Sequence, residues 1–161
     1  PRKTVGDIVG EPFEVHPEVV PKGGRRRRVQ ELLEVVGLNP EHINRYPHEF
    51  SGGQCQRLVI ARALLRSDSA VYIFDEAASN IDVESEELIM NVIHELAKTK
   101  TVLLISHRLA NVVQSDQIYF LKNGTICERG THAELMEQNG AYRHLYDSQM
   151  VLENYGKQGN A

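Results

Sequence analysis

The sequence has few cysteines and no long hydrophobic run. Its two cysteines, Cys55 and Cys127, form neither a disulfide framework nor a zinc-binding spacing, which favours a reducing compartment. No apolar stretch approaches the roughly 18 residues of a membrane span, and no signal-peptide pattern follows the polar residues 1–4. The start also lacks a methionine, so we expect the chain to begin partway into a longer protein.

An excess of positive charge is absent as well. The formal net charge is −4, which gives no general reason to expect nucleic-acid binding. Hydrophobic residues make up 41% of the chain and charged residues 25%, a composition typical of soluble globular proteins rather than of disordered ones. The run of arginines from Arg25 to Arg28 favours a solvated helix face over a nucleic-acid patch or a targeting signal, because it begins an amphipathic helix in an acidic chain.

The first part of the chain predicts helices. Apolar residues recur at helical spacing over 25–36 and again over 54–66, and Gly37 is a natural helix stop. Residues 1–24 predict an irregular or partly helical entry. We therefore expect residues 1–66 to form a mainly helical subdomain.

From residue 67 to 161 strand and helix patterns alternate. The Asn123-Gly124 pair predicts a hairpin turn, and Thr131 with Glu134 predicts a capping box. We expect strands at 70–74, 101–105, 117–121 and 125–128, and helices at 84–98, near 109–114 and at 141–152. The alternation before residue 121 predicts an α/β fold with a parallel sheet.

Two adjacent acids, Asp75 and Glu76, follow the strand predicted at 70–74. The carboxyl end of a buried strand is where α/β sheets bind ligands. Neighbouring carboxylates repel each other unless a cation or a proton relay uses them. The alternative is an acidic helix N-terminus, which the helix dipole favours.

A Ser-Gly-Gly-Gln segment precedes these acids by about twenty residues. Two glycines let a backbone approach a phosphate closely, and the amides at the start of the following helix point at the anion. The alternative is a turn that only caps the helix. The segment consists of Ser51, Gly52, Gly53 and Gln54.

Two further features follow in order. Asp82 ends a Ser-Asn-Ile-Asp segment, residues 79–82, and its alternative role is a plain helix N-cap. His107 follows the strand predicted at 101–105. At a strand's carboxyl end, it could donate a hydrogen bond to a phosphate, although a lone histidine is more often structural or exposed.

The four segments together resemble the ATP-binding cassette (ABC) ATPase family over nearly the whole chain. In this order, residues 51–54 resemble the ABC signature, residues 74–76 the Walker B motif and residues 79–82 the D-loop, where the family usually has Ser-Ala-Leu-Asp. His107 matches the switch histidine. The resemblance implies a P-loop NTPase (RecA-like) parallel-sheet lobe over 67–161, preceded by the helical signature subdomain.

The resemblance also implies roles for these residues. Asp75 would hold the Mg²⁺ of MgATP through water, and Glu76 would polarise the attacking water. His107 would contact the γ-phosphate, and Asp82 would lie at a dimer seam. The signature residues Ser51, Gly52, Gly53 and Gln54 would serve ATP held by a second nucleotide-binding domain.

The sequence departs from the family in what precedes the signature. No Gly-x-x-x-x-Gly-Lys-Ser/Thr stretch, the Walker A loop, occurs in the 161 residues, and no Q-loop is recognisable. In the family's sheet the Walker A strand lies between the strands expected at 101–105 and 117–121. We expect the fold to be incomplete, with exposed apolar faces, and the chain alone to be an inactive ATPase.

Two lineages are represented in the sequence. Residues 1–54 resemble the ATPases of oligopeptide and dipeptide importers, whereas residues 55–155 resemble exporter ATPases fused to their own membrane domain. This pattern suggests a chimera, natural or engineered, that is joined within the signature. Expected partners are a second cassette and transmembrane permease domains, at the cytoplasmic side of a bacterial membrane. Two alternatives remain: a non-catalytic half-cassette that only pairs with complete ones, and a soluble ABC ATPase without a transport role.

Overall fold

The computed structural model describes residues 3–66 and 68–158, and these divide into two units. The first unit is residues 1–103 and the second is residues 104–161, so the division falls inside a strand. Each unit is described by itself. In the described residues, no helix combines the length and the apolar character that a membrane crossing requires.

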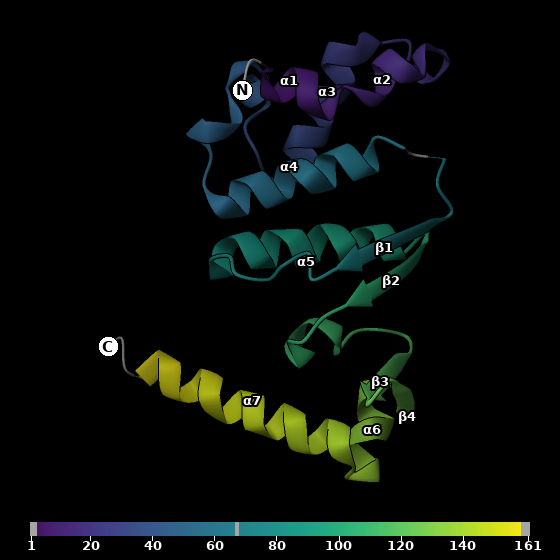
Figure 1. Ribbon diagram of the computed structural model, residues 1–161, viewed down its shortest axis with the longest axis vertical. Coiled ribbons are helices and arrows are strands. Elements are labelled where there is room, and N and C mark those ends of the chain that lie inside the picture. Colours follow the sequence, from purple (N-terminus) through teal and green to yellow (C-terminus); the bar gives the residue numbers. More distant parts are fainter. Residues whose placement is uncertain (1–2, 67, 159–161) are drawn as a thin grey trace. The chain divides into compact units, whose positions relative to one another are not determined.

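The first unit begins with short helices (Figure 1). Thr4 starts α1 (Val5–Val9) with a capping box, in which its hydroxyl accepts from the Asp7 amide and Asp7 accepts from the Thr4 amide. Helix α2 (Pro12–Val15) and a 3-10 turn (Pro17–Val19) follow. This confirms the partly helical entry predicted for residues 1–24 over residues 3–24, and residues 1 and 2 lie outside the described residues.

Helix α3 (Gly24–Val35) carries the main apolar face of the first unit. Val29, Leu32 and Leu33 are buried on it, and Val5 and Val9 of α1 are buried as well. The helix ends at Val35 with Val36 as its C-cap, and the predicted stop, Gly37, follows directly with a left-handed φ of 69° that suits glycine best. Helix α3 packs on 3-10 helix Pro40–Asn44 and on α4 (Gly52–Leu64).

Helix α4 leads into the strands of this unit. A short 3-10 helix, Pro47–Glu49, precedes it. Strand β1 (Val71–Asp75), helix α5 (Val83–Ala97) and strand β2 (Thr101–Ile105) lie within one residue of their predicted positions. The arrows of β1 and β2 run in the same direction in Figure 1, and the two strands form a two-stranded sheet. The parallel pair predicted for this region is therefore confirmed.

The second unit is built around a hairpin. Strands β3 (Ile118–Lys122) and β4 (Thr125–Gly130) pair antiparallel, with a register shift between Phe120 and Leu121. The turn residues Asn123 and Gly124 have φ of 52° and 76°, as a type I′ turn requires. Strands β2 and β3 belong to different sheets in the described structure. The expected position of β3 in a larger parallel sheet is thus not realised here.

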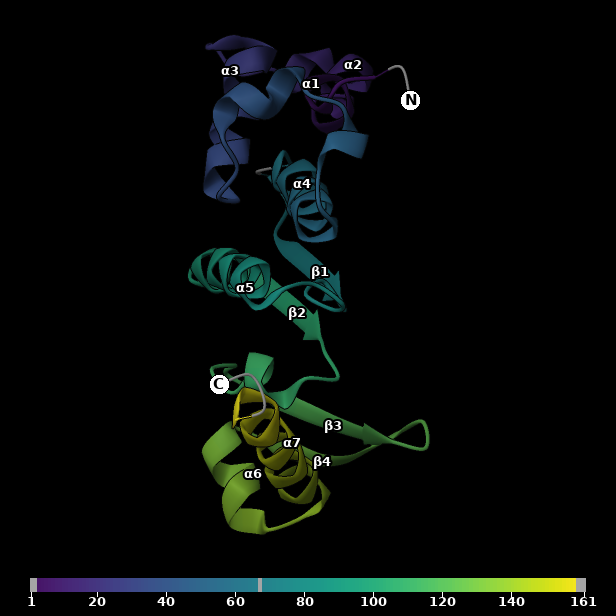
Figure 2. The same ribbon diagram turned by 90° about the vertical axis from the view of Figure 1, so that its left-hand side faces the viewer.

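Helices α6 (His132–Gln138) and α7 (Ala141–Gln158) complete the second unit beside the hairpin (Figure 2). The capping box of Thr131 and Glu134 is confirmed. The core is formed by residues from the 3-10 helix Leu109–Val112, the hairpin and both helices: Leu109, Val112, Ile118, Leu135 and Tyr142. The predicted end of the last helix at 152 is too early, because no proline interrupts the following residues and the helix runs to Gln158.

Candidate nucleotide-binding segments

The signature-like segment forms the start of α4. Ser51 is its N-cap, with its hydroxyl 3.3 Å from the Gln54 amide, and Gln54 Oε1 accepts from the Ser51 amide at 3.0 Å. This capping box satisfies two backbone donors that a helix start leaves without partners. The other amides of the first turn point along the helix axis, where the dipole favours an anion.

The two glycines of this segment differ in their surroundings. A Cβ added at Gly52 would meet nothing within 4 Å, so that position is open. A Cβ at Gly53 would lie 2.6 Å from Ser85 Cβ and 2.9 Å from Asp82 Oδ2. Gly53 therefore allows the start of α4 to approach the start of α5, whereas Gly52 leaves room for a ligand.

Asp82 is the N-cap of α5, as its alternative role predicts. Its Oδ1 accepts from the Ser85 amide at 2.8 Å. Hydrogen bonds from Ser85, the backbone amide first, lower the pKa of this carboxyl below its ordinary 3.8. Because Gly53 lies against it, Asp82 joins the signature-like segment and the 79–82 segment in one place.

The two acids follow directly on β1. Asp75 is the last residue of the strand and is exposed. Glu76 adopts a left-handed backbone with φ of 52°, which is uncommon for a residue other than glycine. The Glu76 carbonyl accepts from the Ser79 amide at 3.1 Å and from its hydroxyl at 2.9 Å. These bonds hold a tight turn that swings the chain away from the strand.

The donor set near Asp75 fits magnesium that arrives with phosphate. Among the residues that the structure describes, no group of three or more His, Cys, Asp or Glu side chains could hold a metal ion by itself. Mg²⁺ commonly keeps several waters and uses one or two carboxylates together with substrate phosphates. Asp75, exposed at the strand end, is suited to supply one such carboxylate.

His107 lies in the second unit and is exposed. Ser106 Oγ accepts from the Arg108 amide at 3.1 Å, which forms a turn around the histidine. The His107 carbonyl accepts from Gln149 Nε2 of α7 at 2.7 Å, and the Leu109 amide donates to Gln149 Oε1 at 2.9 Å. Sequence reasoning missed Gln149, since no local pattern relates positions 40 residues apart.

The arginine run is used within the chain. Arg25 pairs with Glu14 at 2.7 Å and donates to the Asp7 carbonyl at 3.3 Å. The other three contact Asn44 or Glu31. These contacts agree with the solvated helix face that the sequence favours.

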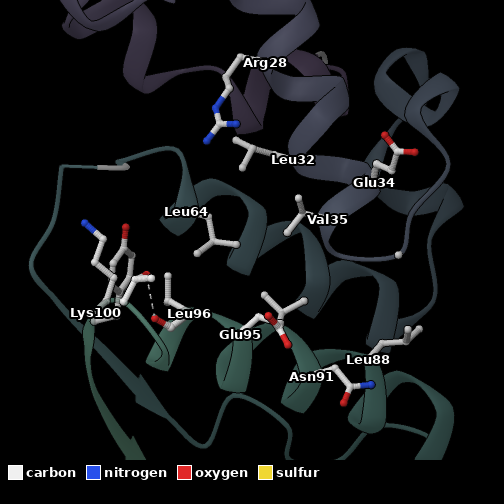
Figure 3. Close-up of a pocket in the computed structure, with 14 residues that line it drawn as sticks. Arg28, Leu32, Glu34, Val35, Leu64, Leu88, Asn91, Glu95, Leu96 and Lys100 are labelled. Atoms are coloured by element: carbon white, nitrogen blue, oxygen red, sulfur yellow. Dashed lines mark hydrogen bonds between the residues drawn. The ribbon is translucent and has the colours of Figure 1, made fainter.

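The first unit also contains a cleft that none of the motif residues line, and Figure 3 shows its lining residues. It has a volume of about 560 Å³ and lies between α3 and α5. Leu64, at the end of α4, and Leu96, near the end of α5, point into it. Residues 51–54 and Asp82 stand at the opposite, N-terminal ends of α4 and α5, and no motif residue lines the cleft, so this cleft is not the candidate site.

The comparisons with known proteins identify the family. Residues 1–79 match the family model described as ABC transporter. A protein of Haemophilus influenzae described as an uncharacterized ABC transporter ATP-binding protein is 50% identical over 125 residues, 78% of this chain and 22% of that protein. The chain belongs to the ABC transporter family of ATP-binding proteins.

Other ABC relatives are of both expected types. The oligopeptide transport ATP-binding protein OppF of Bacillus subtilis is 47% identical over 140 residues, 85% of this chain and 46% of that protein. The ATP-dependent lipid A-core flippase of Mannheimia succiniciproducens is 54% identical over 99 residues, 62% of this chain and 17% of that protein. The chain thus spans less than half the length of each of these relatives.

A solved ABC structure has a similar fold. A bacterial Atm1-family ABC exporter with ATP bound matches with a TM-score of 0.71 and 25% identity, over 91% of this chain and 26% of that one. The likeness is consistent with part of an α/β P-loop NTPase. The OppF match is longer than either side of the junction expected at residue 54, so it runs across that point. The chimera stays a prediction.

Proposed function

We propose that this ABC chain contributes two sets of residues to ATP hydrolysis that drives transport. Ser51, Gly52, Gly53 and Gln54 serve ATP held by a second nucleotide-binding domain. Asp75, Glu76 and His107 serve ATP held within their own cassette, with Asp82 at the seam between the two domains. When bound, Mg²⁺ neutralises charge on the transferred phosphate.

The conformation of Glu76 carries this proposal. A left-handed glutamate directly after an exposed aspartate at a strand end costs backbone energy, which is tolerated where a site needs the side chain aimed. Its carboxylate would orient and polarise the attacking water. Asp75 would hold Mg²⁺ through water, and His107 would donate to the γ-phosphate.

The surroundings of the signature-like segment support its proposed contact with ATP that a second nucleotide-binding domain holds. The open position at Gly52 and the capped start of α4 suit a phosphate that approaches from outside the chain. The Gly53 contact keeps Asp82 beside that start. One surface would therefore meet both the partner's nucleotide and the partner's domain.

Phosphate binding by this chain alone is proposed to be very weak. The P-loop amides and lysine supply most phosphate contacts in such enzymes, and no such motif occurs in the 161 residues. We therefore propose that the chain does not turn over ATP by itself. In a complete cassette the same residues would support hydrolysis.

The sheet of the first unit supports the need for a further element. Val71 and Ile73 of β1 and Leu103 of β2 are 55%, 65% and 49% exposed. Large apolar residues gathered on one sheet face favour burial against another surface. The strand and helix of a Walker A lobe would supply that cover. The remaining partners would be transmembrane permease domains at the cytoplasmic side of the membrane.

The proposal is tested by adding the missing part. A separately purified Walker A-bearing lobe from a homologous cassette is mixed with this chain, and phosphate release is measured. Turnover is expected only in the mixture, and Glu76→Gln should abolish it. Glu84→Gln, in the exposed first turn of α5, is the matched control and should leave turnover intact. Activity that Glu76→Gln leaves unchanged would contradict the proposal.

The missing motif favours a second candidate, a non-catalytic half-cassette. Such a chain would bind complete cassettes through the signature-like surface without hydrolysing ATP itself. The mixing experiment separates the two functions, because an interaction module would bind the added lobe and remain silent in phosphate release.

A further inference from the structure

We infer that Gln149 of α7 is a positioning residue for His107. Both polar atoms of the Gln149 side-chain amide form hydrogen bonds with the backbone around His107. Its Nε2 donates to the His107 carbonyl at 2.7 Å, and its Oε1 accepts from the Leu109 amide at 2.9 Å. Both lengths are those of well-formed hydrogen bonds. One side chain thereby fixes the backbone on both sides of residue 108.

The bound segment has little other freedom. Leu109 is only 5% exposed and packs in the core of the second unit. The Ser106 hydroxyl accepts from the Arg108 amide on the other side of the histidine. Hydrogen bonds therefore hold the backbone on both sides of the His107 ring, and His107 itself is exposed. A fixed backbone limits the directions that this ring can take.

The position of Gln149 is itself set by α7. Tyr142, Tyr146 and Gln149 are spaced as i, i+4 and i+7, so they share one helix face. Tyr142 is fully buried, and its hydroxyl lies 2.8 Å from His132 Nδ1. Tyr146 lies 4.9 Å from the His132 ring, measured between ring centroids. These contacts fix the rotation of α7 about its axis.

A carboxylate from the hairpin fixes the start of the same helix. Glu128 of β4 accepts from the backbone amides of Ala141 and Tyr142, the latter at 3.0 Å. The helix is thus capped by a side chain from another element. The hairpin sets the start of α7, α7 sets Gln149, and Gln149 sets the backbone at His107. Docking of α7 is therefore required for the proposed phosphate contact.

The hydrogen bonds are tested on the chain as it is. Amide hydrogen exchange is followed by NMR in Gln149→Ala, with Val151→Ala as the control on the same helix. Alanine is the best helix former, so α7 should persist. The Leu109 amide should exchange roughly fivefold faster or more, the size expected for one lost hydrogen bond. The Tyr142 and Tyr146 amides should be unchanged. Unchanged exchange at Leu109 would overturn the inference.

A second variant separates positioning from mere stability. Gln149→Glu keeps an acceptor for the Leu109 amide but places a carboxylate against the His107 carbonyl. Protection at Leu109 should remain, while the His107 ring signals shift relative to the wild type and Val151→Ala. Equal loss at Leu109 and throughout α7 would show a purely structural role and overturn the inference.

The predicted effect of Gln149 on catalysis rests on the proposed function. With the Walker A-bearing lobe added, Gln149→Ala should lower kcat about tenfold, the size expected when a donor to the phosphate is misplaced, and leave KM unchanged. A rise in KM with kcat unchanged would overturn the assignment. Absence of turnover with the wild-type chain would reject the proposed function, whereas the exchange at Leu109 would still decide the role of Gln149.

Discussion

The two units hold their candidate segments by different means. In the first unit, Ser51 and Asp82 each accept from an amide three residues later in the chain. In the second unit, the segment around His107 is held from a helix 40 residues away. Short-range caps persist wherever their helix forms, whereas a long-range contact exists only when a whole unit is packed. The His107 segment should therefore be the more sensitive of the two to damage elsewhere.

The largest effect is expected from a substitution in the core of the second unit, which should disturb that unit and leave the first unchanged. Tyr142 is fully buried, so Tyr142→Ala should lower the free energy of unfolding of that unit by about 3–5 kcal/mol. Amide exchange should accelerate around His107 but not at Ser51 or Asp82. Tyr119→Ala, at a 52% exposed position, is the control and should change stability by less than about 0.5 kcal/mol. Equal acceleration in both units would contradict the greater dependence of the His107 segment on long-range packing.

The next effect separates the two glycines of the signature-like segment. Gly53→Ala places a methyl group against Ser85 and Asp82 and should cost about 1–3 kcal/mol through overpacking. Gly52→Ala meets no neighbour and should stabilise α4 by about 0.5–1 kcal/mol. Urea denaturation measures both. If the two substitutions cost the same, the close approach at Gly53 is not what holds the two helix starts together.

A substitution at Glu76 is expected to have a smaller effect on stability, and to stabilise the protein rather than destabilise it. Because its φ of 52° suits glycine better, Glu76→Gly should raise the free energy of unfolding of the first unit by about 0.5–1 kcal/mol. The same variant removes the proposed base and should abolish turnover in the mixing experiment. Glu76→Gln is the control that loses activity without the gain. A destabilised Glu76→Gly would contradict the strain assigned to this residue.

The smallest expected effect is on the loss of stability at acidic pH. Hydrogen bonds from Ser85 hold the pKa of Asp82 below 3.8, so its contribution is present above that value and is lost as the pH falls below about 4. Asp82→Asn keeps a cap but removes the titrating group. Denaturation curves between neutral and acidic pH should show a shallower loss for the variant in the first unit. Parallel curves for both proteins would count against this assignment.

The sequence predicts short-range features well. The stop at Gly37, the Asn123-Gly124 turn and the caps at Ser51, Asp82 and Thr131 depend on neighbours within a few residues, and the structure has each of them. These features place the ends of helices and strands, which is where the candidate residues stand.

Long-range features were not predictable in the same way. The cap that Glu128 gives α7 and the contact of Gln149 with the His107 segment join elements that only packing brings together. The separate pairing of β3 with β4 also depends on which strands are available. The contact between Gly53 and Ser85 left no mark in the sequence beyond a second glycine, which suits a phosphate site equally well.

Calorimetric titration of the purified chain with Mg-ATP, with Glu76→Gln as the comparison, tests directly whether this chain binds nucleotide by itself. We expect no detectable binding by either protein, because the phosphate-binding loop of the family does not occur in the sequence. Clear binding, tightened by Glu76→Gln, would contradict this expectation, since the chain would then form a nucleotide site without that loop.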